Sequence, residues 1–242
     1  MSKIRLDKFT SAALILTRKE SHAIIRAGRV SINGKPVRDI AAKVDSEKDR
    51  VVFDGEIIEY KEFRYYVMNK PAGYITSTEQ KHDKTVMELL PEKLLKLELF
   101  PVGRLDKDTE GLLLLTNNGD LAHRMLSPKH HVDKTYYLES DLPLDELDVQ
   151  AFLDGVDIGE KKITLPATLK IYESDPHKAH ITLCEGKFHQ IKRMLNAVGK
   201  NVTYLERIAF ASLCLPEDLE RGEVRELTSE ETESLEKFGI AE

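Results

Sequence analysis

The stretch GRLDKDTEGLLLLTNNG, residues 103–119, most constrains how this chain folds, because four consecutive leucines follow three closely spaced carboxylates. A short apolar run that ends at an Asn-Gly pair predicts a buried strand. The carboxylates of Asp106, Asp108 and Glu110 then lie in the turn that enters this strand. A carboxylate beside an apolar core is costly unless a cation pairs with it. The stretch therefore requires a basic partner from elsewhere in the chain.

Three kinds of site have carboxylates at this spacing. A calcium loop that starts at Asp106 needs a bidentate glutamate at its twelfth position, where Asn117 stands, so we reject it. A glycosidase pair is also disfavoured, since carboxylates two residues apart do not flank a sugar from opposite sides. The third possibility is a single aspartate near Arg104, serving either in a structural ion pair or in chemistry. The segment EGKFHQIKRML offers Lys192 and Arg193 as its basic partners.

Length and composition favour a globular protein with one large core or two smaller ones. The chain has 242 residues, of which 41% are apolar. No apolar stretch approaches the roughly 18 residues that span a bilayer, and the start MSKIRLDKF has no signal-peptide h-region. The two cysteines form no CxxC pair. We therefore expect a soluble, cytoplasmic protein with reduced thiols and no membrane partner.

Charge is distributed unevenly along the chain. The overall net charge is −6, which by itself argues against a nucleic-acid partner. Residues 1–38, however, hold nine basic and two acidic residues, a net charge of +7. Residues 215–242 hold three basic and ten acidic residues, a net charge of −7. Because potential is local, the basic N-terminal segment remains a candidate RNA-binding surface, with two ordinary solvated faces as the alternative.

The first 60 residues predict helices followed by small hairpins. Thr17 and Glu20 have the spacing of a capping box, and Gly28 predicts the end of that helix. Asn33-Gly34 and Asp54-Gly55 each stand between two short β-prone runs and predict tight hairpins. Helices that carry arginine and lysine beside such hairpins form a plausible RNA-binding unit.

The composition changes after the charged segment KEFR, residues 61–64. Strands are predicted in YYVMNKPAGYI, GLLLLT, KTYYLESDL, ATLKIYES and KAHITLCEG. Short helices are predicted in TVMELLPEKLL, broken by Pro91, in DLAHRMLSP and in HQIKRMLNAVG. Many strands with few, separate helices indicate an α+β domain on a largely antiparallel sheet.

The N-terminal pattern resembles the S4 RNA-binding domain over about residues 3–59. RLDKF corresponds to its first helix, TRKESHAIIRAGRVSINGKPV to its second helix and hairpin, and DRVVFDGEII to its last part. The resemblance implies that basic side chains of this unit face RNA phosphates, namely Arg5, Lys8, Arg18, Lys19 and Arg29. Such contacts position a protein on RNA without reading its sequence.

The rest of the chain resembles the Rsu/Rlu pseudouridine synthases. The motifs that carry the resemblance are NKPAGYITS, GRLDKDTEGLLLLTNNG, KTYYL and EGKFHQIKRM, in the family's order. With the S4-like head and SPKHHVDKTY, the chain is most similar to the Rsu-type enzymes, which act on small-subunit (16S) rRNA. The resemblance implies an S4-like domain followed by a larger α+β domain on a mixed, mainly antiparallel sheet. The expected division is 1–60, a linker at 61–64, a catalytic domain at 65–230 and an acidic tail at 231–242.

The family's catalytic residues fall on three positions of this chain. The motif aspartate falls on Asp106, acting at the ribose either as a nucleophile on C1′ or as a base at C2′. The motif tyrosine falls on Tyr136, which stacks on the uracil, and the basic partner of the aspartate falls on Lys192. Tyr137 alternates to the other face of the strand, where it packs in the core.

Two arginines complete the implied RNA contacts. Arg104 matches the arginine that fills the space left by a flipped uridine, and Arg193 is a second contact to phosphate or carboxylate. Asp108 and Glu110 are expected to hold the turn rather than to catalyse. The resemblance implies no cofactor and no metal.

The expected activity is isomerisation of a uridine in 16S rRNA by a monomeric enzyme, on free rRNA or on a ribosome-assembly intermediate. Two alternatives remain open. One is an enzyme of the same subfamily that modifies large-subunit (23S) rRNA. The other is a catalytically silent rRNA-binding assembly factor.

Overall fold

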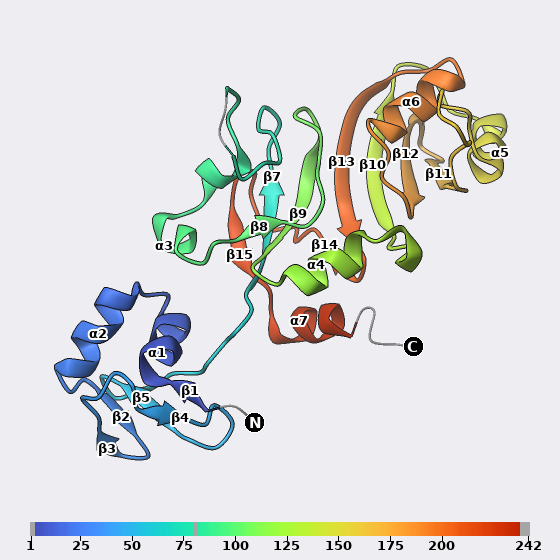
Figure 1. Ribbon diagram of the computed structural model, residues 1–242. Helices are drawn as coiled ribbons and strands as arrows, with labels where there is room; N and C mark the ends of the chain where they lie inside the picture. The colour runs from blue at the N-terminus through green and yellow to red at the C-terminus, as the bar shows by residue number, and fades with distance from the viewer. Residues whose placement is uncertain (1–2, 80–81, 238–242) are drawn as a thin grey trace. The chain divides into compact units, whose positions relative to one another are not determined.

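The computed structural model describes residues 3–79 and 82–237, and the chain divides into two compact units (Figure 1). The first unit comprises Met1–Arg64 with Pro91–Leu99, and the second comprises Tyr65–Leu90 with Phe100–Glu242. Each unit has a hydrophobic core of its own. In the described ranges no helix has the length and apolar character needed to cross a bilayer.

The first unit combines short helices with small antiparallel sheets. Its helices are α1 (Leu6–Leu14), α2 (Arg18–Arg26) and α3 (Glu92–Leu95). One sheet has the order β3-β2-β5-β6, formed by β2 (Val30–Ile32), β3 (Lys35–Pro36), β5 (Val51–Phe53) and β6 (Glu56–Ile57). A second sheet pairs β1 (Ile4–Arg5) with β4 (Lys43–Val44). The core between helices and strands contains Leu6, Phe9, Ile25, Val30, Val44 and Val51.

Local sequence signals explain why these elements begin and end where they do. Thr17 and Glu20 form the expected capping box at the start of α2. Asn33-Gly34 turns the chain between β2 and β3, with φ angles of 52° and 80°. Positive φ at both central residues is the geometry of the tight hairpin that Asn-Gly favours. The hairpin between β5 and β6 at Asp54-Gly55 is confirmed in the same way.

The second unit is built on one mixed sheet with the order β11-β12-β10-β13-β9-β7-β15 among its described residues. Its neighbouring strands pair antiparallel except β9 and β13, which run parallel with Glu110 opposite Glu206 and Gly111 opposite Arg207. The prediction of an α+β fold on a mainly antiparallel sheet is therefore confirmed. Two short strands, β8 (Phe100–Pro101) and β14 (Leu213–Cys214), add to β9 and β13. The main strands are β7 (Tyr65–Lys70), β9 (Glu110–Thr116), β10 (Lys134–Ser140), β11 (Thr168–Tyr172), β12 (Asp175–Leu183), β13 (Val202–Phe210) and β15 (Val224–Glu226).

Helices connect and cover these strands (Figure 1). They are η1 (Val86–Leu89), α4 (Gly119–Leu126), η2 (Pro128–His130), α5 (Glu146–Asp154), α6 (Gln190–Ala197) and α7 (Ser229–Glu236). Pro91 separates η1 from α3, as its place in the sequence predicts. Helix α7 begins at Ser229, two residues before the segment expected as an acidic tail, and its Glu231 pairs with Arg225 at 2.8 Å. Residues 238–242 of that expected tail lie outside the described residues.

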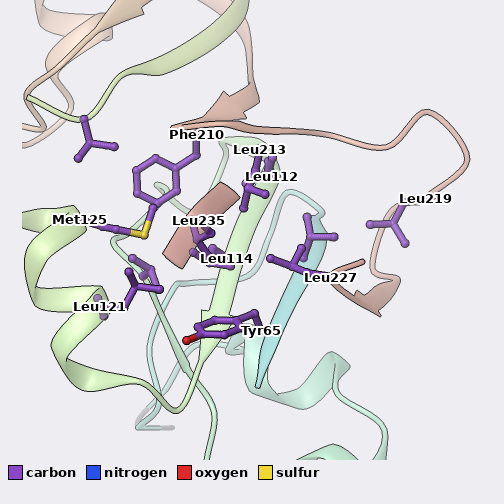
Figure 2. Packing of buried hydrophobic residues seen from close by; sticks show 14 residues of the cluster. Tyr65, Leu112, Leu114, Leu121, Met125, Phe210, Leu213, Leu219, Leu227 and Leu235 are labelled. Atoms are coloured by element: carbon purple, nitrogen blue, oxygen red, sulfur yellow. The ribbon is translucent and has the colours of Figure 1, made fainter. Parts of the chain in front are cut away.

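Strand β9 passes through the middle of the core. Leu112, Leu113, Leu114 and Leu115 are all fully buried. Strand β7 pairs with β9 along these leucines, and β13 pairs with β9 just before them, at Glu110 and Gly111. Figure 2 shows Leu112 and Leu114 packed among side chains of several other elements. The position of β9 is thus fixed on both faces and both edges.

Candidate active site

The backbone of the acidic turn is held by a buried lysine. Lys70, the last residue of β7, is fully buried. Its Nζ donates to the carbonyl oxygens of Thr109 at 2.8 Å, Asp106 at 3.0 Å and Pro71 at 3.1 Å. Burial lowers the pKa of Lys70 to about 8, although the charges of Asp108, Glu110 and Asp106 oppose this. Sequence reasoning gave Lys70 no role, and the available signal was a lysine that ends an otherwise apolar strand.

Lys192 approaches the turn from helix α6. Its Nζ lies 3.1 Å from Oδ2 of Asp106 and 2.6 Å from Oδ1 of Asp108. The Asp106 side chain is 28% exposed, whereas that of Asp108 is 72% exposed. Asp106 therefore faces a partly enclosed space, while Asp108 faces solvent.

The charges of this cluster stabilise one another. Burial acts to lower the pKa of Lys192, but the hydrogen bonds to Asp108 and Asp106 outweigh it, so this pKa lies above that of a free lysine. Desolvation likewise acts to raise the pKa of Asp108, and the hydrogen bond and charge of Lys192 bring it below its usual range. Lys192 consequently presents a permanent positive charge to the carboxylate of Asp106.

A cavity opens over Asp106. Arg104 and Asp106 line it from the turn, Tyr136 lines it from β10, and Lys192 lines it from α6. The apolar part of the wall consists of Leu105, Leu183, Ile191 and Leu205. The structure thus brings the three predicted catalytic residues and Arg104 to one cavity, with an aromatic ring, a cation and a carboxylate around it.

Arg104 and Tyr136 differ in how they are held. Tyr136 is 8% exposed and has a fixed place in the sheet between β12 and β13. Arg104 is exposed, and its guanidinium makes no hydrogen bond or ion pair that the described part of the structure records. A free guanidinium at the mouth of a cavity is available for an anion or a phosphate.

His189 adds a residue to the site that sequence reasoning did not assign. Its Nε2 lies 3.6 Å from Oδ1 of Asp106, on the side of the carboxylate that Lys192 leaves free. The backbone of His189 is left-handed, with φ at 49°, just before α6 begins. Its ring stacks on Phe188 with the ring centroids 3.8 Å apart, and Phe188 is 74% exposed. The one sequence feature that could have identified His189 is its place in the motif EGKFHQIKRM, three residues before Lys192.

Arg193 and Tyr137 point away from the cavity. Arg193 bonds to the Glu160 carboxylate at 2.8 Å and to the carbonyl oxygens of Phe188 and Ile158, outside the cavity. Tyr137 lies on the opposite face from Tyr136 and packs edge-on against Tyr172 and Tyr204.

Glu110 ties the turn to its surroundings. Its carboxylate accepts from the backbone N–H of Ala72 at 3.2 Å and from the Tyr204 hydroxyl at 2.8 Å. Arg221 Nε lies 3.1 Å from the same carboxylate. These bonds agree with a structural role for Glu110.

The five S4-like basic residues expected to face RNA phosphates all belong to the first unit. Arg5 pairs with the buried carboxylate of Asp7 at 2.9 Å, and Arg18 Nη1 lies 3.6 Å from it. The hydrogen bond from Arg5 is the main cause that lowers the pKa of Asp7 to about 2. Arg29 pairs with Asp54, while Lys8 and Lys19 are exposed. Asp7 thus holds two of the five cations at the surface.

The chain matches two family models. The model described as RNA pseudouridylate synthase matches residues 64–197, and the model described as S4 domain matches residues 4–51. The chain belongs to the RNA pseudouridine synthase family. Both resemblances drawn from the sequence motifs are thereby confirmed.

Relatives of this pseudouridine synthase match it over nearly its full length. An uncharacterized RNA pseudouridine synthase of Bacillus subtilis is 44% identical, covering 96% of this chain and 98% of its own. The ribosomal small subunit pseudouridine synthase A of Yersinia pestis is 42% identical over the same shares of the two chains. The Escherichia coli (strain K12) protein of that name is 39% identical, covering 96% of this chain and all of its own. A crystal structure of a pseudouridylate synthase superimposes with a TM-score of 0.68 and 38% identity, over 96% of this chain and 99% of that one.

Proposed function

We infer that this pseudouridine synthase isomerises one uridine of small-subunit (16S) rRNA. Two relatives that match 96% of the chain are named ribosomal small subunit pseudouridine synthases. The observation that carries the chemical part is the cavity in which Asp106 faces Lys192 beside Tyr136. An aspartate held by a fixed cation next to an aromatic wall is what chemistry at a nucleoside needs.

The reaction breaks the bond between N1 of uracil and C1′ of ribose, turns the base and joins C5 to C1′. The proton on C5 leaves, and N1 gains one, so the reaction is an isomerisation without a cofactor or a metal. Asp106 acts at the ribose, as a nucleophile on C1′ or as a base at C2′. Both roles need the carboxylate held in place, and Lys192 Nζ contacts its Oδ2 at 3.1 Å.

Tyr136 and Arg104 serve the base and the RNA around it. Tyr136 stacks on the uracil from its place in the sheet. A uridine in structured RNA must leave its stack to reach the cavity, at a cost of a few kcal/mol. Arg104, which is exposed and uncommitted, fills the vacated space and meets backbone phosphate.

The first unit docks the enzyme on rRNA through Arg5, Lys8, Arg18, Lys19 and Arg29. Arg193, on α6 of the second unit, is a second contact to phosphate or carboxylate. We assign residues 1–60 to this domain, 61–64 to the linker, 65–230 to the catalytic domain and 231–242 to the tail. The enzyme acts as a monomer in the cytoplasm, on rRNA free or in an assembly intermediate.

Mapping pseudouridines in rRNA from cells that lack the protein tests this function. One 16S pseudouridine should disappear and return when the wild-type gene is restored. The Asp106→Asn variant should not restore it. The matched Asp108→Asn variant should restore it, because Asp108 also pairs with Lys192 but is mostly exposed and is not expected to catalyse. Loss of a 23S pseudouridine would show the other rRNA to be the substrate. An unchanged map would favour the non-catalytic assembly factor.

A further inference from the structure

A second cavity adjoins the candidate active site. Arg104, Tyr136 and Lys187 are among the residues that line both cavities. Beyond this shared wall, the second cavity is lined by Lys134, Arg207 and Phe210 and measures about 540 Å³. Cavities of roughly 300–1,000 Å³ hold small ligands. None of the catalytic steps above uses this space.

Lys134 and Arg207 meet in this cavity, and among the described residues no carboxylate bonds to either of them. The hydrogen bond of Lys134 Nζ goes to the carbonyl oxygen of Val132 at 2.8 Å, which leaves two of its N–H groups for other acceptors. Arg207 is 1% exposed, and its Nε donates to the carbonyl oxygen of Leu112 at 2.8 Å. Its Nη2 is buried with no acceptor among the described residues.

Both cations lie over one aromatic ring. Lys134 Nζ is 5.6 Å and the Arg207 guanidinium carbon 4.9 Å from the centre of the Phe210 ring. Figure 2 shows that ring pointing toward Met125 in the core, so this wall is fixed by packing. Cation–π contacts offset only part of the cost of desolvating two like charges.

The nearby carboxylate that could neutralise them is engaged elsewhere. Glu185 lines the cavity, but its Oε1 accepts from Gln190 at 2.6 Å and from the Leu165 N–H at 2.8 Å, and its Oε2 lies 3.5 Å from Nζ of Lys187. Burial lowers the pKa of Lys134, and the charge of Arg207 lowers it further. A bound anion would relieve both effects, because it supplies the missing counter-charge.

The place of Lys134 relative to Tyr136 suggests where such an anion comes from. The two residues lie two positions apart on β10 and therefore on the same face, about 7 Å apart along the strand. A uridine stacked on Tyr136 remains joined to its neighbours by a phosphate on each side. If the strand on one side of the uridine follows the wall that the two cavities share, its phosphate comes close to Lys134.

We propose that the second cavity binds a phosphate of the RNA strand next to the target uridine, with Lys134 donating to its oxygens and Arg207 supplying buried positive charge. This proposal rests on the proposed function for the source of the phosphate. The anion site itself rests only on the two cations. The experiment therefore has one arm without RNA and one with RNA.

The first arm uses inorganic phosphate and the full chain. The thermal unfolding midpoint is measured in phosphate and in chloride at equal ionic strength. Phosphate should raise the wild-type midpoint, because a ligand that binds the folded state stabilises it. Lys134→Gln should lose this specific rise, while Lys170→Gln, which changes an exposed lysine on β11, should keep it. Lys134 is chosen because Arg207 also braces β9 through Leu112.

The second arm uses an rRNA fragment that contains the mapped uridine, with a neutral methylphosphonate on its 5′ or its 3′ side. At one of these positions the wild-type protein should bind about tenfold more weakly, the scale of one lost charge-assisted hydrogen bond. Lys134→Gln should bind the unmodified fragment about tenfold more weakly and show no further loss with the methylphosphonate, because both changes remove the same contact. Its salt dependence, as log K against log salt, should be shallower by about 0.7.

The possible results separate the two claims. Equal stabilisation of wild type and Lys134→Gln by phosphate would overturn the anion site. A phosphate effect without a methylphosphonate effect at either position would overturn the RNA source and leave a free-phosphate site. Additive losses would show that the cavity contacts another group, such as a uracil carbonyl. A wild-type protein that makes no pseudouridine would refute the proposed function, while the first arm would still report on the site.

Discussion

Nζ of Lys192 lies 3.1 Å from Oδ2 of Asp106, although the two residues are 86 positions apart in the chain. Asp106 is placed by the turn before β9, and Lys192 is placed by the first turn of α6. Strand β13, which follows α6, pairs in parallel with β9 immediately after the acidic turn. The pairing of the two strands thus brings the carboxylate and the ammonium group together.

Replacing Lys192 by methionine should therefore lower catalysis without weakening RNA binding to the same degree. Methionine keeps the length and the packing but removes the charge that faces Asp106. Loss of one preorganised electrostatic contact typically lowers a rate by about 10²–10³-fold. The measurement is the single-turnover rate of pseudouridine formation on saturating 16S rRNA.

Lys192→Arg is the matched control, since it keeps the charge within reach of both carboxylates. Its rate should stay within about tenfold of wild type. A methionine variant as fast as the arginine variant would show that the charge of Lys192 does not act on Asp106.

Lys70→Met should loosen the catalytic turn. The variant removes the buried ammonium group that holds the carbonyl oxygens of Asp106 and Thr109. Since Asp106 must stay in place against Lys192, we expect the rate to fall at least about tenfold while RNA affinity changes little. Lys107→Met, in the same turn but exposed and paired with Asp83, should keep nearly full activity.

The pH dependence of stability gives an independent test of Lys70. Its pKa is about 8 in the folded protein and 10.5 as the reference value. Between these pH values the unfolded chain binds the extra proton, so the stability of wild type should rise with pH relative to Lys70→Met. The difference in unfolding free energy should grow by about 3 kcal/mol between pH 7 and 10.5, measured by urea titration. A constant difference would mean that Lys70 is not desolvated.

Lys8→Gln combined with Lys19→Gln should weaken rRNA binding in a salt-dependent way. Both side chains are exposed on the helices of the first unit. Each lost phosphate contact should make the slope of log K against log salt shallower by about 0.7–0.9, so the pair should change it by about 1.5. Filter binding at salt concentrations from about 50 to 300 mM would measure this slope. Lys35→Gln with Lys48→Gln, two exposed lysines of the same unit, should leave the slope unchanged.

The sequence predicted local features well because their causes are local. The capping box at Thr17, the Asn-Gly hairpin and the buried leucine strand all depend on residues within a few positions of one another. The need for a counter-charge suggested Lys192 or Arg193 as the partner of the acidic turn, and the family resemblance singled out Asp106 and Lys192. The resemblance located the residues, and the structure supplies the distances.

Other parts of the site had no signal that reasoning from one sequence detects. Lys70 and Arg207 are charged residues in strands, where charge usually indicates a solvated face, yet both are buried. Their burial follows from carbonyl oxygens supplied by segments far away in the chain. His189 lies near Asp106 with its backbone in a left-handed conformation. The sequence around a histidine does not predict this conformation. Strand β13 was not predicted at all, although the site depends on it.

Gly111→Ala should separate β9 from β13 and so disrupt the strand pairing that positions the site. Gly111 has φ at +97°, and a Cβ placed on it would lie 2.3 Å from the carbonyl oxygen and 2.8 Å from the nitrogen of Arg207. Both atoms belong to the backbone of β13, so neither strand can yield without losing the pairing that brings Lys192 to Asp106. We expect unfolding free energy to fall by more than about 3 kcal/mol. Gly159→Ala, also at positive φ but with nothing within 4 Å, should cost only about 1 kcal/mol. Equal losses in urea titrations of the two variants would show that backbone conformation alone, rather than the close approach of the strands, requires glycine at position 111.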